Sequence, residues 1–124
     1  MSSKVRIFIC NWETEAECLQ KNLFGDPNSW PMNVIAGENC VLFNYYTNML
    51  HGLWYAESSG KIDIDPWAWK GKFKYQISVK LVSKERITLS SVEIKKLFPN
   101  NLDWYKQNTI SGSVAQTVLS YFAS

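Results

Sequence analysis

The chain alternates apolar and polar residues most regularly over residues 72–82. A period of two residues is typical of a strand with one face buried. The pattern therefore predicts a half-buried strand whose outer face is basic. The two alternating sets are Phe73, Tyr75, Ile77, Val79 and Leu81 on the apolar side, and Lys72, Lys74, Gln76, Ser78 and Lys80 on the polar side.

Three apolar runs in the first half of the chain also predict strands. Residues 5–10 are β-branched and aromatic, which favours a strand. The runs 40–46 and 50–58 are joined by Thr-Asn-Met, which indicates a tight hairpin. Gly52 lies inside the second of these runs, where a glycine indicates a bulge or the close approach of another segment.

A short helix is expected over residues 14–24. Thr14 and Glu17 have the spacing of a capping box, and Gly25 supplies the left-handed residue that ends many helices. Residues 26–39 contain two prolines and a glycine, so they are predicted as a loop. The apolar face of the helix would consist of Ala16, Leu19 and Leu23.

The last third of the chain has the periodicity of helices. Ser90 and Glu93 form a second capping box, and Pro99 ends the helix that follows. Ser113 and Gln116 repeat this spacing before an amphipathic terminal helix. The order strand, helix, hairpin, long loop, strand, helices favours the α+β class, with a small barrel of mostly antiparallel or mixed strands.

Composition is that of an ordinary globular protein, with 46% hydrophobic and 19% charged residues. Its 124 residues fit a single domain over 1–124. No apolar run approaches the roughly 20 residues of a membrane span, and no signal peptide is visible. We expect an intracellular protein, cytoplasmic or, in a eukaryote, nuclear. Three cysteines without Cys-x-x-Cys spacing agree with a reducing compartment: Cys10, Cys18 and Cys40.

Few residues suggest catalysis. His51 is the single histidine and lies in the predicted hairpin, where a packed or hydrogen-bonded ring is the simplest role. The sequence has neither a Cys/His cluster nor a glycine-rich phosphate loop, so we expect no enzyme, no metal and no cofactor. Asp63 and Asp65 could cap a turn or contact a base edge, and the Asp-Pro pair favours the turn.

Basic charge collects beside two tryptophans. Residues 1–60 hold three basic and six acidic side chains, whereas residues 61–86 hold seven basic and three acidic ones. A solvated strand face and a surface for phosphates explain this equally well. Tryptophan suits core edges and binding surfaces, and bases stack on its face. Trp54 and Trp104 look like packing residues, and the spacing of Trp69 favours a fold anchor. The candidates for base stacking are Trp12, Trp30, Trp67 and Trp69.

Four segments resemble, in order, those of the DCD (development and cell death) domain: IFICNWETEAECLQKNLFG, VLFNYYTNMLHGLWYAESSG, IDIDPWAW and FKYQISVKL. The resemblance covers about residues 5–82. Such domains are best known in plant proteins linked to stress and cell-death signalling. Trp69 belongs to the family pattern, whereas Trp12, Trp54 and Trp67 do not. The shared motifs fall on Cys10, Asn11, Glu17–Leu19, Leu23–Gly25, Phe43–Tyr45, Leu50–Gly52, Ala56–Gly60, Ile64–Trp69 and Gln76.

The order of elements is similar, more distantly, to the YTH and EVE domains of the PUA-like group, which bind RNA or DNA. This resemblance implies a PUA-like barrel with flanking helices and an aromatic cage for a flipped base, with or without a methyl group. The implied base-binding residues are Asn11, Trp12, Trp30, Trp67 and Trp69. Phosphates would meet Arg6, Lys70, Lys72 and Lys74.

Two functions follow from these observations. The first is a non-catalytic nucleic-acid-binding module that holds a flipped base of RNA or single-stranded DNA in an aromatic cage. The second is a protein-protein interaction module of DCD type in stress or cell-death signalling, with exposed tryptophans as contact hot spots. Neither function needs a membrane.

Overall fold

The computed structural model describes residues 3–101 and 103–122. Its α-helices are α1 (Glu15–Lys21), α2 (Ser91–Leu97) and α3 (Gly112–Phe122). Short 3-10 helices are η1 (Trp30–Asn33), η2 (Ala68–Gly71) and η3 (Trp104–Gln107). The strands are β1 (Lys4–Cys10), β2 (Leu23–Asp26), β3 (Asn39–Asn44), β4 (Met49–Ala56), β5 (Lys61–Ile62), β6 (Tyr75–Leu81), β7 (Ile87–Leu89) and β8 (Thr109–Ser111).

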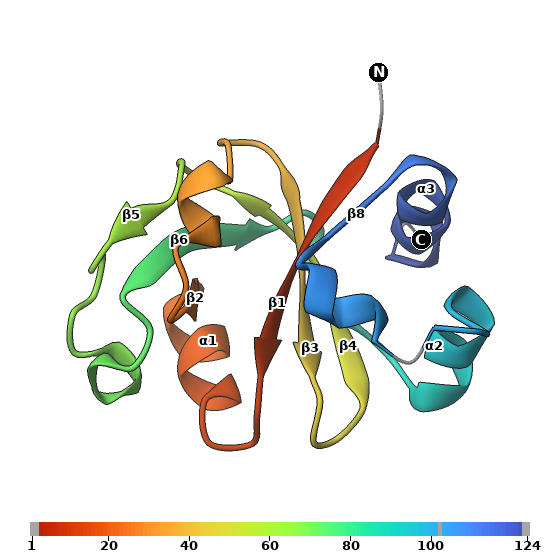
Figure 1. Cartoon of the computed structure of the whole chain (residues 1–124), viewed down its shortest axis with the longest axis horizontal. Coiled ribbons are helices and arrows are strands. Elements are labelled where there is room, and N and C mark those ends of the chain that lie inside the picture. Colours follow the sequence, from red (N-terminus) through yellow and green to blue (C-terminus); the bar gives the residue numbers. More distant parts are fainter. Residues whose placement is uncertain (1–2, 102, 123–124) are drawn as a thin grey trace.

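These strands form one curved, mixed sheet in the order β2-β6-β4-β3-β1-β8 (Figure 1). β5 pairs with β6 and β7 with β4. The pairing of β1 with β3 is parallel, and the other pairings are antiparallel. The predicted hairpin is confirmed as β3 and β4, with Leu42 opposite His51 and a register shift just before it.

The α+β class is confirmed, but the expected closed barrel is wrong. Closure would need a ladder from β2, at one edge of the sheet, to β1 or β8 on the other side. β1 instead carries β3 on one edge and β8 on the other, with Val5 opposite Ile110. Among the described residues no ladder pairs β2 with β1, although their side chains pack together, as the rings of Phe8 and Phe24 do at a centroid distance of 5.5 Å. The sheet therefore curves strongly but stays open between β2 and β8.

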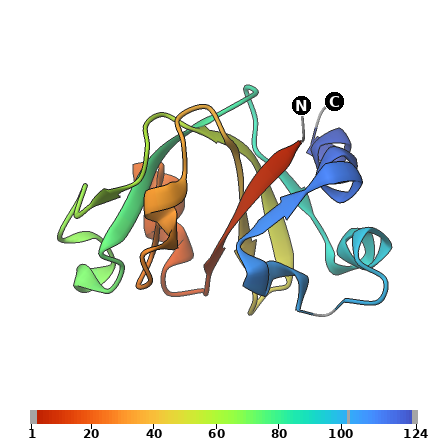
Figure 2. The same ribbon diagram turned by 45° about the horizontal axis from the view of Figure 1, so that its top comes forward.

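Both faces of the sheet are buried. Alternate residues of β1 point to opposite sides, as a strand requires: Phe8 belongs to one core cluster and Ile7 to the other. The first cluster lies beneath α1 and η2, and the second beneath α2, α3 and η3. In Figures 1 and 2, α2 and α3 lie together at the end of the molecule opposite β5 and β6. Gly52 permits this packing, because a Cβ there would lie 2.9 Å from the ring of Phe122.

The first helix is shorter than predicted. α1 ends at Lys21, and Asn22 takes the left-handed conformation (φ 49°, ψ 49°) that was expected of Gly25. Residues 23–26 instead form β2, which pairs with β6, and Gly25 lies against the ring of Trp69, where a Cβ would come within 2.9 Å of it. The expected capping box at Thr14 is also absent, since the helix has no side-chain cap there.

The helices of the last third are mostly as predicted. The capping box of Ser90 and Glu93 opens α2 and is confirmed. α3 begins at Gly112, so Ser113 lies within its first turn and not at its cap. Within the predicted loop 26–39, Trp30 opens the short helix η1.

The alternation of β6 holds except at Gln76. This side chain was predicted on the exposed face but is buried. Its Nε2 donates to the carbonyl oxygens of Phe73 and Asp65 at 2.7 and 3.0 Å, and its Oε1 accepts the backbone N–H of Asp65 at 2.8 Å. Residues 65–73, called the 65–73 loop below, therefore fold back over the polar face of β6.

Candidate functional site

The 65–73 loop is fixed against α1 at several points along the helix. Lys21 donates to the carboxylate of Asp65 at 2.7 Å near the C-terminus of α1. The backbone N–H of Trp69 donates to Glu17 at 2.9 Å, and its indole Nε1 donates to the carbonyl of Thr14 at 3.1 Å. Loop and helix thus present a common surface, seen beside one another in Figure 1.

The two tryptophans of this loop point to different environments. Trp69 is 3% exposed and belongs to the core, whereas Trp67 is 84% exposed. Asp65 holds the turn by accepting the backbone N–H of Trp67 at 3.0 Å, as the Asp-Pro pair predicted. Trp69 and Lys70 both take left-handed backbone conformations, with φ of 51° and 56°. The backbone reversal directs the indole of Trp69 inward and leaves Trp67 in solvent.

A second exposed tryptophan precedes α1. Trp12 is 65% exposed and follows the end of β1. Its neighbour Asn11 uses its side-chain Oδ1 to accept the backbone N–H groups of Glu13 at 2.8 Å and Thr14 at 3.0 Å. This local turn is the usual role of asparagine at such positions. The side-chain oxygen of Asn11 is therefore occupied by this turn, in which Trp12 stays exposed at the surface.

A pocket of about 290 Å³ opens where β1 and β2 end. Asp26, a residue only 6% exposed, contributes a carboxylate, and Tyr45 and Phe73 contribute aromatic rings. Its complete lining is Ile9, Cys10, Asn11, Thr14, Gly25, Asp26, Pro27, Asn28, Tyr45, Lys72 and Phe73. A neighbouring hollow of about 220 Å³ shares two of these residues and is lined by Glu13, Thr14, Glu17, Trp69, Lys70 and Lys72. We call these two hollows the end pocket and the helix pocket.

The structure brings some of the predicted site residues together and separates others. Asn11 and Lys72 line the end pocket, and Trp69, Lys70 and Lys72 line the helix pocket. Lys74 is exposed at the end of the loop and lines neither. Three residues were missed from the sequence: Asp26, Tyr45 and Phe73. The Asp26-Pro27 pair signals a turn, but burial of Asp26 depends on contacts distant in sequence.

Trp30 packs into the first core cluster. Its ring lies 4.5 Å from that of Phe8, centroid to centroid, at an interplanar angle of 40°. Its Nε1 is buried and has no hydrogen-bond partner among the residues that the structure describes. One side of this indole is therefore occupied by the core, and Trp30 lines neither the end pocket nor the helix pocket.

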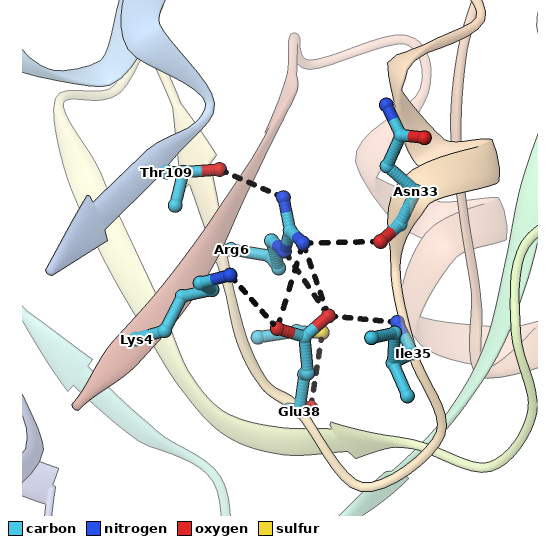
Figure 3. A network of polar contacts seen from close by, with 7 residues as sticks. Lys4, Arg6, Asn33, Ile35, Glu38 and Thr109 are labelled. Carbon is cyan, nitrogen blue, oxygen red and sulfur yellow. Dashed lines mark hydrogen bonds and ion pairs between the residues drawn. The ribbon is translucent and has the colours of Figure 1, made fainter. Parts of the chain in front are cut away.

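Arg6 is committed to an internal polar network (Figure 3). Its guanidinium donates to the Glu38 carboxylate at 3.1 Å, to the Thr109 hydroxyl at 3.1 Å and to the Asn33 carbonyl at 3.1 Å. Glu38 also accepts the backbone N–H of Ile35 at 2.7 Å. The network joins β1, β8, the end of η1 and the residue just before β3, so Arg6 acts here as a cross-link between these segments.

Replacing Arg6 by methionine should destabilise the protein without affecting binding at the pockets. The Glu38 carboxylate would stay partly buried without its partner, which should lower the free energy of unfolding by about 2–3 kcal/mol. Urea unfolding measures this loss, and adding Glu38→Leu should restore part of it. The exposed Lys80→Met is the control and should change stability by less than about 0.5 kcal/mol. Equal effects of the two methionine variants would contradict this role.

His51 is buried and hydrogen-bonded, as expected. Its Nδ1 lies 2.9 Å from the Thr88 hydroxyl, and its Nε2 lies 3.1 Å from a Glu15 carboxylate oxygen. Burial lowers the pKa of His51, although the Glu15 carboxylate opposes this shift and the Arg86 charge adds to it. The ring therefore stays neutral in the folded protein at pH values where the unfolded chain is already protonated.

The depressed pKa of His51 makes stability depend on pH. Below the ordinary histidine pKa of about 6.5 the unfolded state binds more protons than the folded state, so the free energy of unfolding should fall as the pH falls. His51→Gln should flatten this slope between roughly pH 7 and 5. Urea titrations at several pH values measure it. An unchanged slope in the variant would show that His51 is not responsible.

Three further properties of the described residues concern membrane spans, metal ligands and the ionisation of cysteines. None of the described helices is both long and apolar enough to span a bilayer. Residues 3–101 and 103–122 contain no group of three or more histidine, cysteine, aspartate or glutamate side chains placed to hold a metal ion. Burial raises the pKa of the Cys18 thiol to about 12 and that of Cys40 to about 12, so both remain protonated.

Fold and site together define an α+β domain that presents two tryptophans and a small polar pocket at one end of a mixed sheet. The family model described as Development and cell death domain matches residues 4–118. The chain therefore belongs to the development and cell death domain family. The match continues through the C-terminal third, well beyond the motifs within 5–82.

Curated relatives agree with this assignment. The chain is 37% identical over 87 residues to the DCD domain-containing protein NRP-B of Glycine max, an alignment of 64% of the chain and 26% of that protein. It is 45% identical over 69 residues to NRP-A of Glycine max (53% and 19%) and 44% identical over 69 residues to the B2 protein of Daucus carota (53% and 33%). The alignments thus span a third or less of each relative.

Proposed function

We propose that this chain is a non-catalytic protein-interaction module of the DCD type, acting in stress or cell-death signalling. Its contact surface would be α1, the 65–73 loop, the helix pocket between them and the adjoining end pocket. The observation that carries this proposal is the exposure of Trp67 (84%) and Trp12 (65%) on a surface that Trp69 fixes from beneath.

Exposed tryptophans on rigid supports are typical of protein-interaction hot spots. Tryptophan is enriched among the few residues that dominate binding energy, because a large ring is buried with little loss of side-chain freedom. The helix α1 has seven residues and spans about 10 Å, so anchors near its two ends suit a short peptide or a single helix of a partner. Trp12 precedes α1, and Trp67 lies two residues after Asp65, which is tied to the end of α1.

The nucleic-acid alternative has less support at this surface. Trp30 and Trp69 pack against core rings and Arg6 is bound to Glu38, so three of its expected contacts have structural partners. Lys70 and Lys74 remain available to phosphates, whereas Lys72 lies 4.0 Å from a Glu13 carboxylate oxygen. Glu13 and Glu17 lie among these lysines, however, and would repel a phosphate backbone.

Selection of phage-displayed random peptides on the immobilised chain tests the proposal. We expect one sequence family to be enriched and to lose about tenfold or more in affinity for Trp67→Ala, as at an interface hot spot. Val82→Ala, at another exposed apolar residue, is the matched control and should bind normally. Failure to enrich any peptide, or binding indifferent to Trp67 and Trp12, would contradict the proposal. Trp67-dependent binding of single-stranded RNA or DNA at low salt would favour the alternative.

A further inference from the structure

We infer that the end pocket binds a guanidinium group, the arginine side chain of a partner protein. This inference rests on the proposed function, because it names the group that the interaction surface would recognise. It starts from the least expected side chain of the pocket, the carboxylate of Asp26, a residue that is only 6% exposed.

The Asp26 carboxylate lacks a full set of partners. Its Oδ1 accepts the backbone N–H of Asn28 at 2.8 Å, and Oδ2 receives no hydrogen bond from any residue in the described ranges. Within the same ranges Asp26 forms no ion pair, although its residue is only 6% exposed. Oδ2 is not one of the fully buried atoms that lack a partner, so it faces solvent in the pocket and is open to hydrogen-bond donors and to an opposite charge. A cationic ligand with several N–H donors would provide both.

The other walls of the pocket suit the flat face of a guanidinium. The rings of Tyr45 and Phe73 line the pocket, and Phe73 is held in place by Trp69, with 5.0 Å between ring centroids. Guanidinium groups stack on aromatic rings and donate to carboxylates in a fixed geometry, which ammonium groups do not match. The volume of about 290 Å³ is at the lower end for ligand pockets, so it has room for a single side chain.

Among the lining residues, Lys72 carries a positive charge that would repel a cationic ligand. Lys72 also lines the pocket, and its Nζ lies 4.0 Å from a carboxylate oxygen of Glu13. Repulsion by Lys72 should weaken the binding of a guanidinium, whereas attraction by Lys72 would strengthen the binding of an anion. The response to removing Lys72 therefore reports the sign of the charge that the pocket prefers.

Titration of the ¹⁵N-labelled chain with butylguanidinium, followed by NMR, tests this inference. We expect saturable shifts in the amide signals of Asn11, Asp26, Asn28 and Phe73, with a dissociation constant on the order of 1–10 mM for so small a probe. Butylurea has the same shape without charge and should not saturate these shifts. Butyrate tests for an anion site. Saturation by butyrate, equal shifts with butylurea, or no localised shifts would overturn the inference.

Two variants test the assigned charges. Asp26→Asn keeps an oxygen for the Asn28 N–H, so the turn should persist, but butylguanidinium binding should weaken about fivefold or more. Asp63→Asn removes the same charge at an exposed residue outside the pocket and should leave binding unchanged. Lys72→Met should tighten binding by about twofold or more. Weaker binding to Lys72→Met, or unchanged binding to Asp26→Asn, would overturn the inference.

The peptide selection and the butylguanidinium titration together distinguish a failure of the guanidinium site from a failure of the proposed function. In one outcome, the selected peptides lack arginine, need Trp67 for binding, and bind Asp26→Asn as tightly as the wild type. That result would support the interaction module and overturn the guanidinium site. Butylguanidinium binding without any selected peptide would support the pocket and contradict the interaction module.

Discussion

Replacing Trp69 by alanine is expected to lower the free energy of unfolding by about 3–5 kcal/mol, the usual effect of truncating a buried tryptophan. The indole is 3% exposed, packs 5.0 Å from the Phe73 ring and lies against Gly25. Its Nε1 also donates to Thr14, which ties the 65–73 loop to α1. The variant therefore loses both core volume and the attachment of the loop.

The matched control lies two residues away. Trp67→Ala makes the same chemical change at an 84% exposed side chain and should alter stability by less than about 0.5 kcal/mol. The stability loss of Trp69→Phe should lie between those of Trp67→Ala and Trp69→Ala, because phenylalanine keeps an aromatic ring but loses the hydrogen bond to the Thr14 carbonyl. Urea unfolding of the three variants gives the comparison. Similar losses for Trp67→Ala and Trp69→Ala would contradict the division of roles between the tryptophans.

Gly60→Ala should have a similarly large effect for a different reason. A Cβ at Gly60 would lie 1.9 Å from the carbonyl oxygen of Pro31 and 2.5 Å from its carbonyl carbon. Both are backbone atoms of η1, which cannot move aside as a flexible side chain could. We expect a loss of about 3 kcal/mol or more, a large part of the 5–15 kcal/mol typical of a domain.

Gly37→Ala is the control for the loss of glycine itself. Gly37 has a φ of +91° but nothing within 4 Å of its added Cβ. Alanine there should cost about 1–2 kcal/mol through backbone strain alone. Thermal unfolding of both variants separates strain from collision. A Gly60→Ala protein as stable as the wild type would show that η1 does not pack on this glycine.

Local patterns predicted the elements that depend on nearest neighbours in sequence. The alternation over 72–82 corresponds to β6, the runs around Thr-Asn-Met to the β3–β4 hairpin, and the pair Ser90 and Glu93 to the start of α2. Each of these signals acts within a few residues and is not displaced by distant contacts, whereas the equally local pair Thr14 and Glu17 forms no capping box and Glu17 accepts the backbone N–H of Trp69.

The errors arose where distant contacts decide the structure. Gly25 has a helix-ending residue type, but its lack of a side chain serves the approach of Trp69. Gln76 alternates correctly for an exposed position, yet the 65–73 loop covers it and satisfies its amide. The expected barrel stays open, and β8, from the far end of the chain, pairs with residues 4–6 at the outer edge of β1.

Only part of the candidate site could be predicted, again because contacts distant in sequence bring the rest of it together. The sequence placed Trp67, Trp69 and the neighbouring lysines in one region, and the structure assigns Trp69 to the core and Trp67 to the surface. The burial of Asp26 depends on β2 pairing with β6 and on the return of the 65–73 loop. No local pattern around Asp26 contains that information.

The location of the selected peptide on the ¹⁵N-labelled chain tests the central claim most directly. The account predicts that chemical-shift changes follow α1 and the 65–73 loop, include the indole N–H of Trp12 and of Trp67, and are lost in the variant that replaces both by alanine. Changes confined to α2 and α3, or a peptide that binds the double variant as well as the wild type, would contradict the assignment of this surface to partner binding.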